Sequence, residues 1–274
     1  MKFEEVVKKL SVAGVQDARL EAKFLIEELC GERVCESQEY DNVLLEDALE
    51  KRACGYPLQY IIGKWWFARC EFEVDENCLI PRPDTECLVE EAVQILPTNA
   101  AFADLCTGSG CIAVSIADLR PDTRGVAVDL YPKTLDIAKR NARRNNVADR
   151  LAFILGDVLS GDVLGEEKFS AIISNPPYIR RGVIDTLSRE VSFEPRVALD
   201  GGEDGLAFYR AIVGKYQKNL DTDGRFIFEI GYDQAEGIRA IAADNGFSCN
   251  VKKDLGGNYR VAVLEKRNNP SVEE

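Results

Sequence analysis

The chain has 274 residues, with 47 acidic side chains, 34 basic ones, a formal net charge of -13 at pH 7 and no histidine. This length suits one large domain or two smaller ones, and 46% hydrophobic with 30% charged residues is ordinary for a folded globular protein. Without histidine, neither a Ser-His-Asp nor a Cys-His catalytic site can form. The acidic balance argues against stable nucleic-acid binding, which depends on neutralising phosphates.

The nine cysteines are odd in number and include no Cys-x-x-Cys pair. The acidic start, Met1-Lys2-Phe3-Glu4-Glu5, is unlike a secretory signal, and no apolar run approaches the ~18 residues that a membrane helix needs. We therefore expect a cytoplasmic protein with reduced thiols, without a metal site and without membrane attachment.

Residues 1–62 are predicted to form a small bundle of helices. Apolar side chains recur there at helical spacing, with no strand-like alternation between them. The apolar stripes are Phe3, Val7 and Leu10, then Leu20, Phe24, Leu25 and Leu29, then Leu44, Leu45 and Ala48. Gly31 can end the second helix, and Gly55 the third. With 8 basic and 13 acidic side chains, this segment is suited to docking a basic partner surface.

Residues 63–83 are predicted to form a β-hairpin linker. The segments Trp65-Trp66-Phe67 and Phe72-Glu73-Val74 are aromatic or β-branched, and Ala68-Arg69 is a candidate turn between them. Pro81 and Pro83 do not fit a helix interior, so a boundary falls at the end of this linker.

Helix-like and strand-like segments alternate through residues 84–274. Strands are expected at 100–105, 125–129, 151–155, 171–174, 225–230, 248–253 and 259–266, and helices at 84–96, 111–119, 133–145, 206–220 and 235–245. The order predicts an α/β domain with a doubly wound, mostly parallel, seven-stranded Rossmann-like sheet. The last two strands are too close for a crossover helix, so one end strand should be antiparallel. Asp84 is a candidate helix N-cap, and Asn268–Glu274 should be a frayed tail.

A glycine-rich loop follows the first strand of this domain. It reads Asp104-Leu105-Cys106-Thr107-Gly108-Ser109-Gly110, and its glycines let the backbone approach a ligand beside a helix N-terminus. Asp129 ends the next strand, 19 residues beyond Gly110, where a carboxylate can bind ribose hydroxyls. Asp157 ends the third strand and can approach the base.

The loop alone does not identify its ligand, because it also fits a dinucleotide fingerprint or an ordinary tight turn. Asp104 separates the ligands, since a carboxylate beside the loop would repel a pyrophosphate and attract the ammonium group of an amino acid. Together with Asp129, this pattern favours S-adenosylmethionine over NAD.

The motif Ser174-Asn175-Pro176-Pro177-Tyr178-Ile179 follows the fourth strand, at the edge of the sheet where ligands bind. The two prolines make the loop rigid. The side-chain oxygen of Asn175 and a nearby backbone carbonyl can accept both hydrogens of a planar –NH₂ group, and Tyr178 can stack on that group. Acceptors placed there stabilise the transition state of methyl transfer to the nitrogen. The predicted substrate is therefore a base amine or a carboxamide.

Further motifs extend over nearly the whole chain: GYPLQYIIG at 55–63, LIPRPDTE at 79–86, FEPRVAL at 193–199 and GGEDGL at 201–206. With the two loops above, they resemble the release factor glutamine methyltransferases, the HemK/PrmC family of class I S-adenosylmethionine-dependent enzymes. The resemblance implies a five-helix N-terminal domain, a hairpin and a seven-stranded methyltransferase domain. It also implies methyl transfer to the side-chain amide nitrogen (N5) of glutamine in the Gly-Gly-Gln motif of class-1 peptide chain release factors.

The family resemblance implies the same site residues as the two loop motifs indicate. The candidate catalytic residues are Asn175, Pro176 and Tyr178, and the substrate-binding residues are Asn175, Pro176, Pro177 and Tyr178. The candidate cofactor-binding residues are Asp104, Cys106, Thr107, Gly108, Ser109, Gly110, Asp129, Asp157, Val158 and Asn175. Val158 departs from the family, which often has an aromatic residue over the adenine at this place. Cys106 stands where the family frequently has glycine.

Three alternatives remain open. An amino-methyltransferase acting on adenine in DNA uses the same Asn-Pro-Pro-Tyr chemistry, but the acidic charge and the short segment 180–195 argue against it. A catalytically idle cofactor-binding scaffold is disfavoured by the intact Asn175 and Asp129. An NAD-dependent dehydrogenase is disfavoured by Asp104 and would have no use for Asn-Pro-Pro-Tyr. We expect a monomer whose partner is the release factor.

Overall fold

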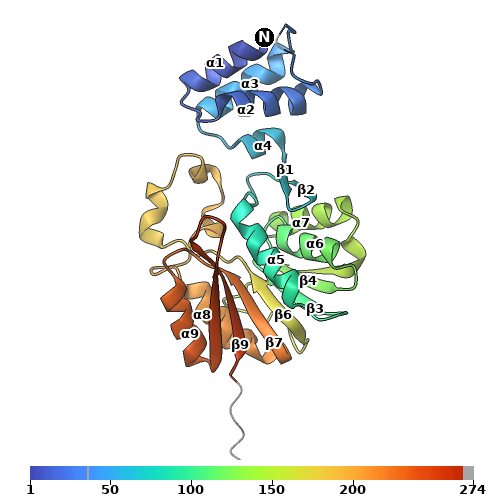
Figure 1. Ribbon diagram of the computed structural model, residues 1–274, viewed down its shortest axis with the longest axis vertical. Helices are drawn as coiled ribbons and strands as arrows, with labels where there is room; N and C mark the ends of the chain where they lie inside the picture. Colours follow the sequence, from blue (N-terminus) through green and yellow to red (C-terminus); the bar gives the residue numbers. More distant parts are fainter. Residues whose placement is uncertain (36, 268–274) are drawn as a thin grey trace, which may run out of the picture.

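The computed structural model describes residues 1–35 and 37–267, so the predicted tail at Asn268–Glu274 lies outside the described residues. Within that part, four α-helices precede the first strand (Figure 1): α1 (Phe3–Val12), α2 (Ala18–Leu25), α3 (Asn42–Ala53) and α4 (Leu58–Ile62). A π-helical turn at Ile26–Cys30 extends α2 to Gly31, whose φ of 70° is left-handed, as predicted for a helix end. Five helices were expected in the N-terminal domain, and the described residues there form four α-helices and this π-helical turn.

The core of the helical bundle differs in part from the predicted stripes. Val6, Leu25 and Leu45 are fully buried, whereas Leu20 and Leu44 are 54% and 52% exposed. The prediction was wrong for Leu20 because α2 buries its small residues Ala18 and Ala22 and so turns Leu20 outward. It was wrong for Leu44 because α3 buries Leu45 and Ala48 instead. Small side chains allow helices to pack closely, so a stripe of large apolar residues does not always mark the buried face of a helix.

A two-stranded hairpin joins the bundle to the sheet. Strands β1 (Lys64–Phe67) and β2 (Cys70–Glu73) pair antiparallel around Ala68, whose φ is 51°. Asn141 of α7 (Pro132–Arg144) fastens the hairpin, since its side chain accepts from the Glu73 N–H at 2.7 Å and donates to the Glu73 carbonyl at 3.0 Å. Phe67 and Phe72 are buried in the same apolar cluster as the helices of the sheet domain.

The central sheet has seven strands in the order β5-β4-β3-β6-β7-β9-β8. They are β3 (Ala101–Leu105), β4 (Arg124–Asp129), β5 (Leu151–Leu155), β6 (Phe169–Ser174), β7 (Leu220–Glu229), β8 (Phe247–Lys253) and β9 (Tyr259–Lys266). The α/β prediction is confirmed. The antiparallel strand is β9, which is inserted between β7 and the edge strand β8.

Helices cover both faces of the sheet. One apolar cluster joins it to α5 (Glu86–Ile95), α6 (Cys111–Leu119) and α7, and another joins it to α8 (Ala207–Tyr216) and α9 (Ala235–Asp244). Asp84 does not cap α5. It lies in a 3₁₀ turn at Pro83–Thr85 and pairs with Arg260 at 3.0 Å.

The connection between β6 and α8 carries three 3₁₀ turns, at Arg181–Thr186, Val191–Phe193 and Arg196–Ala198. It rises above the sheet toward the helical bundle (Figure 1). Arg52 of α3 pairs there with Glu190, and the rings of Tyr56 and Phe193 meet edge-on with centroids 5.3 Å apart. The bundle and the sheet domain are therefore in direct contact. No helix in the described part is both long and apolar enough to cross a membrane.

Candidate active site

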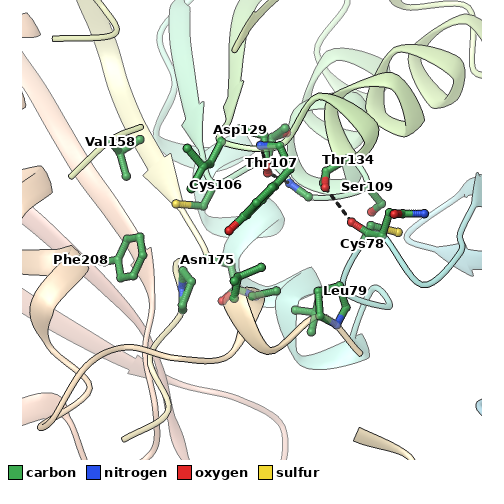
Figure 2. Close-up of a pocket in the computed structure, with 18 of the residues that line it drawn as sticks. Cys78, Leu79, Cys106, Thr107, Ser109, Asp129, Thr134, Val158, Asn175 and Phe208 are labelled. Carbon is green, nitrogen blue, oxygen red and sulfur yellow. Dashed lines mark hydrogen bonds between the residues drawn. The ribbon is translucent and has the colours of Figure 1, made fainter. Parts of the chain in front are cut away.

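A cavity of about 330 Å³ opens at the carboxyl ends of β3, β4, β5 and β6. Parallel strands bring their carboxyl ends to one edge, so loops far apart in the sequence line the same space (Figure 2). Nine of the predicted residues line it: Cys106, Thr107, Gly108, Ser109, Asp129, Asp157, Val158, Asn175 and Pro177. Four lie outside its lining: Asp104, Gly110, Pro176 and Tyr178.

The glycine-rich loop is shaped by left-handed backbone at Cys106, Gly108 and Gly110, with φ of 63°, 57° and 82°. At Gly110 a β-carbon would also stand 3.2 Å from the α-carbon of Ala138, so close packing against α7 requires glycine. Cys106 adopts a conformation that costs a non-glycine residue roughly 1–2 kcal/mol. The loop backbone therefore keeps its shape despite the cysteine.

Asp104 lies beneath this loop. Its Oδ2 accepts from the Thr107 hydroxyl at 2.6 Å and from the Ala113 N–H at 3.2 Å. Its Oδ1 has no hydrogen-bond partner among the described residues, and neither has the buried hydroxyl of Ser109. Burial raises the pKa of Asp104 to about 7. The Ser109 hydroxyl lines the cavity and can bond a ligand, whereas Asp104 is fully buried and does not line it.

Two carboxylates lie at the carboxyl ends of neighbouring strands: Asp129 is the last residue of β4, and Asp157 lies just beyond the end of β5. Asp129 is largely buried, and its oxygens accept from the backbone N–H groups of Gly108 at 3.0 Å and Tyr131 at 3.1 Å. Burial raises the pKa of Asp129, whereas hydrogen bonds from the Ser160 hydroxyl and the Leu159 N–H lower the pKa of Asp157. Both carboxylates face the cavity and can accept from hydroxyl or amino groups of a nucleoside.

An aromatic wall comes from a residue that the sequence did not point out. Phe208 of α8 lines the cavity on the same side as Val158, near Cys106 and Asn175 (Figure 2). The flat ring of Phe208 and the branched side chain of Val158 together give this part of the cavity an apolar wall that a planar ring could pack against. Val158 is thus not the only residue that gives the cavity an apolar surface here.

The side-chain amide of Asn175 is anchored by a hydrogen bond to Thr85. Its Nδ2 donates to the Thr85 hydroxyl at 3.2 Å, and no described residue donates to its Oδ1. The oxygen therefore keeps its capacity to accept hydrogen bonds from a ligand. Thr85 also lines the cavity and was not predicted, although it lies in the motif at 79–86.

The Asn-Pro-Pro-Tyr loop is fixed by the segment that follows residue 198. The Ile179 N–H donates to the Leu199 carbonyl at 2.9 Å, and the Gly201 N–H donates to the Ile179 carbonyl at 2.9 Å. A β-carbon at Gly201 would stand 2.8 Å from the Pro177 carbonyl oxygen, so only glycine permits this approach. Tyr178 turns its hydroxyl to Glu229, to which it donates at 3.2 Å.

The opposite wall is the segment Ile80-Pro81-Arg82. The buried carboxylate of Glu194 accepts from the Ile80 N–H at 3.1 Å and pairs with Arg82. This contact ties the wall to the connection between β6 and α8, which contributes Arg181 and Val197 to the cavity. Among residues 1–35 and 37–267, no three Cys, Asp or Glu side chains gather where they could hold a metal ion.

Comparison with known proteins identifies the family of this chain. The model of the methyltransferase small domain family matches residues 84–192. The release factor glutamine methyltransferase of Caulobacter vibrioides is 36% identical over 267 residues, which cover 93% of this chain and 92% of that protein. The protein of that name from Geobacter sulfurreducens is 39% identical over 262 residues, or 92% and 91% of the two chains.

The fold is also seen in a solved structure, a methyltransferase from Pyrococcus furiosus. The TM-score is 0.54 at 17% identity, and the match covers 71% of this chain and 87% of that one. At this identity the similarity shows the fold alone.

Proposed function

The chain belongs to the family of release factor glutamine methyltransferases, and from that premise we propose that it methylates the side-chain amide nitrogen of a glutamine in a peptide chain release factor. The proposed target is the glutamine of the Gly-Gly-Gln motif in class-1 release factors, and the proposed methyl donor is S-adenosylmethionine. The observation that carries the proposal is Asn175, whose amide oxygen keeps its acceptor capacity in a cavity lined by nucleoside-binding groups.

The cofactor site fits the chemistry of S-adenosylmethionine. Asp129 is placed to accept from the ribose hydroxyls, and Val158 with Phe208 offers apolar walls for the adenine. The Ser109 hydroxyl, which lines the cavity and has no hydrogen-bond partner among the described residues, suits the carboxylate of the methionine part. When bound, this cofactor supplies an electrophilic methyl group on a sulfonium. The remaining work of the protein is to orient the nucleophile and to exclude water.

Asn175 orients that nucleophile. Its Oδ1, together with a backbone carbonyl of the Asn-Pro-Pro-Tyr loop, accepts the two hydrogens of the glutamine amide. As the nitrogen gains the methyl group it becomes positive, and acceptors already aimed at it stabilise that charge. The nitrogen then loses one proton to solvent, so the reaction needs no histidine.

We further propose a division of labour along the chain. Residues 1–62 dock the body of the release factor, residues 63–83 act as a linker, and residues 84–274 carry out methyl transfer. The acidic balance of the first segment supports the docking role, as does its direct contact with the loop that carries Glu190 and Phe193. A single loop glutamine offers little surface, whereas stable recognition usually buries ~1,200–2,000 Å² in total. Because release factors act in translation, the proposed place of action is the cytoplasm.

The proposal is tested by offering two substrates to the protein with methyl-labelled S-adenosylmethionine. Label should pass to a purified class-1 release factor and not to duplex DNA that contains adenine. Transfer to DNA instead would favour the adenine amino-methyltransferase. Cofactor binding without transfer to either substrate would favour an idle scaffold.

A further inference from the structure

A buried glutamine with no assigned task joins three segments around the Asn-Pro-Pro-Tyr loop. Gln234 lies in the turn between β7 and α9 and is only 5% exposed. Its Oε1 accepts from the Gly231 N–H at 2.9 Å, and its Nε2 donates to the carbonyls of Tyr178 at 2.9 Å and Gly205 at 3.0 Å. The oxygen and both N–H groups of this amide are therefore paired, so the amide can be buried with little penalty.

The space for this amide is made by a glycine of the motif at 201–206. A β-carbon at Gly205 would stand 2.7 Å from Gln234 Nε2 and would also meet the Tyr178 carbonyl oxygen. The φ of Gly205 is 76°, a value that residues with a side chain rarely adopt. The motif thus lets the glutamine reach the far end of the Asn-Pro-Pro-Tyr loop.

The two prolines do not by themselves place Asn175. Their rings fix two φ angles and leave the ψ angles variable, so the course of the loop depends on what holds its two ends. The near end continues β6, where the Ser174 hydroxyl donates to the Leu105 carbonyl. The far end is at Tyr178, whose carbonyl is bound by Gln234.

We propose that Gln234 is a positioning residue that holds the Asn-Pro-Pro-Tyr loop so that Asn175 faces the substrate amide. The two bonds from Gln234 Nε2 to the Tyr178 and Gly205 carbonyls form what we call the glutamine clamp. Gln234 does not line the cavity, so it acts through the loop and not on the reacting atoms. A displacement of about 1 Å in a group that orients a nucleophile can cost about 10²-fold in rate.

The glutamine clamp also reaches the start of α8, through the Gly205 carbonyl. This helix carries Phe208, which lines the cavity, but its own side chains Tyr209 and Ile212 are fully buried and hold it on the sheet. Loss of the clamp should therefore release the loop and leave the helix in place. Methyl transfer should suffer more than cofactor binding does.

The experiment compares Gln234→Glu with the wild type, using release factor as substrate, and this part rests on the proposed function. A glutamate has the same size and still accepts from the Gly231 N–H, but when ionised it has no hydrogen to donate to the two carbonyls. The kcat should fall about 10- to 100-fold. The KM for release factor and the Kd for S-adenosylmethionine should change little, since neither ligand contacts Gln234.

The matched control is Asn219→Asp. Asn219 is 1% exposed, and its Nδ2 likewise donates to two carbonyls, those of Gly165 at 2.9 Å and Glu167 at 2.8 Å. It precedes the first residue of β7, at the edge of the sheet opposite the cavity. The replacement adds the same charge and removes the same two bonds, so it should leave kcat unchanged. A full rate in Gln234→Glu, or an equal loss in Asn219→Asp, would overturn the proposal.

A second readout does not depend on the substrate. The Ile179 N–H belongs to the same peptide group as the Tyr178 carbonyl and donates to the Leu199 carbonyl at 2.9 Å, so its hydrogen exchange reports whether the far end of the loop is held. Exchange at Ile179, followed by NMR, should be about tenfold faster in Gln234→Glu, as expected for the loss of one buried hydrogen bond, and unchanged in Asn219→Asp.

The two readouts separate the glutamine clamp from the proposed function. Unchanged exchange at Ile179 in Gln234→Glu would overturn the clamp even if kcat falls. Faster exchange there, in a protein that methylates no release factor, would support the clamp and refute the proposed function. If Gln234→Glu does not fold, the uncharged pair Gln234→Met and Asn219→Leu provides the same comparison.

Discussion

The replacement Asp129→Asn tests the cofactor site most sharply, because it removes a charge and one acceptor while keeping the size of the side chain. Each carboxylate oxygen already accepts one backbone N–H, from Gly108 or Tyr131, and has capacity for one ribose hydroxyl. An asparagine keeps one oxygen and turns an –NH₂ group toward the other backbone N–H. One hydroxyl and one loop N–H should therefore lose their acceptor.

The size of the effect follows from the bonds lost. Hydrogen bonds to a charged group contribute about 1.5–3 kcal/mol and those to a neutral group about 0.5–1.5 kcal/mol. Removing the charge and one acceptor should weaken binding by about 1–3 kcal/mol, which is about 5- to 150-fold in Kd. Calorimetric titration with S-adenosylmethionine measures this directly. Asp136→Asn, on the exposed face of α7, makes the same change in net charge and should bind as the wild type does.

An analogue without the two ribose hydroxyls separates ribose recognition from damage to the loop. The Asp129→Asn change should weaken binding of this analogue less than it weakens binding of S-adenosylmethionine, since no ribose hydroxyl is left to lose its acceptor. Wild-type affinity in a folded Asp129→Asn protein, or a loss that is the same with and without the hydroxyls, would contradict the placement of the ribose.

Three more predictions concern other parts of the chain. Phe208→Ala should weaken S-adenosylmethionine binding about tenfold in calorimetry, since an aromatic wall is lost, and unchanged affinity would remove Phe208 from the adenine site. The pKa of Asp104 is raised to about 7 in the folded protein, so the free energy of unfolding of the apo protein should depend on pH. The stabilisation is fully present below about pH 4 and is lost as the pH rises through 7, with a total loss of up to about 4 kcal/mol. Urea unfolding should show this loss of stability in the wild type and not in Asp104→Asn. If the unfolding free energies of the two proteins changed with pH in parallel, the role of Asp104 would be contradicted. A chain beginning at Gly63, which keeps the hairpin because Phe67 and Phe72 belong to the sheet core, should bind cofactor but methylate intact release factor much more slowly. Circular dichroism comes first, and a folded truncated protein working at the full rate would disprove the docking role.

The sequence could predict the sheet because each of its strands has a local signature. Strands such as β3 and β4 are buried on both faces, so they read as continuous apolar runs between helices. The rule that ligands bind at the carboxyl ends of such strands then places Asp129, Asp157 and Asn175 together. For these residues, position along a strand is enough to predict position in space.

Other features depend on tertiary contacts that leave no local pattern. The position of β9 between β7 and β8 is a choice of pairing partner, and the spacing of β8 and β9 does not reveal it. The three 3₁₀ turns between β6 and α8 have neither helical nor strand periodicity. Thr85 and Phe208 reach the cavity from segments more than 100 residues apart, so only the folded chain brings them together. Asp104 looked like a lining residue by its place before the glycines, yet it is buried beneath the loop.

The central claim is tested most directly by locating the transferred methyl group. A class-1 release factor incubated with S-adenosylmethionine and the protein should be digested and sequenced by mass spectrometry. One added methyl group is expected, on the side chain of the Gly-Gly-Gln glutamine. With Asn175→Ala, which should still bind cofactor, transfer should be ~10²–10³-fold slower. A methyl group on any other residue, or full turnover by folded Asn175→Ala, would contradict the account.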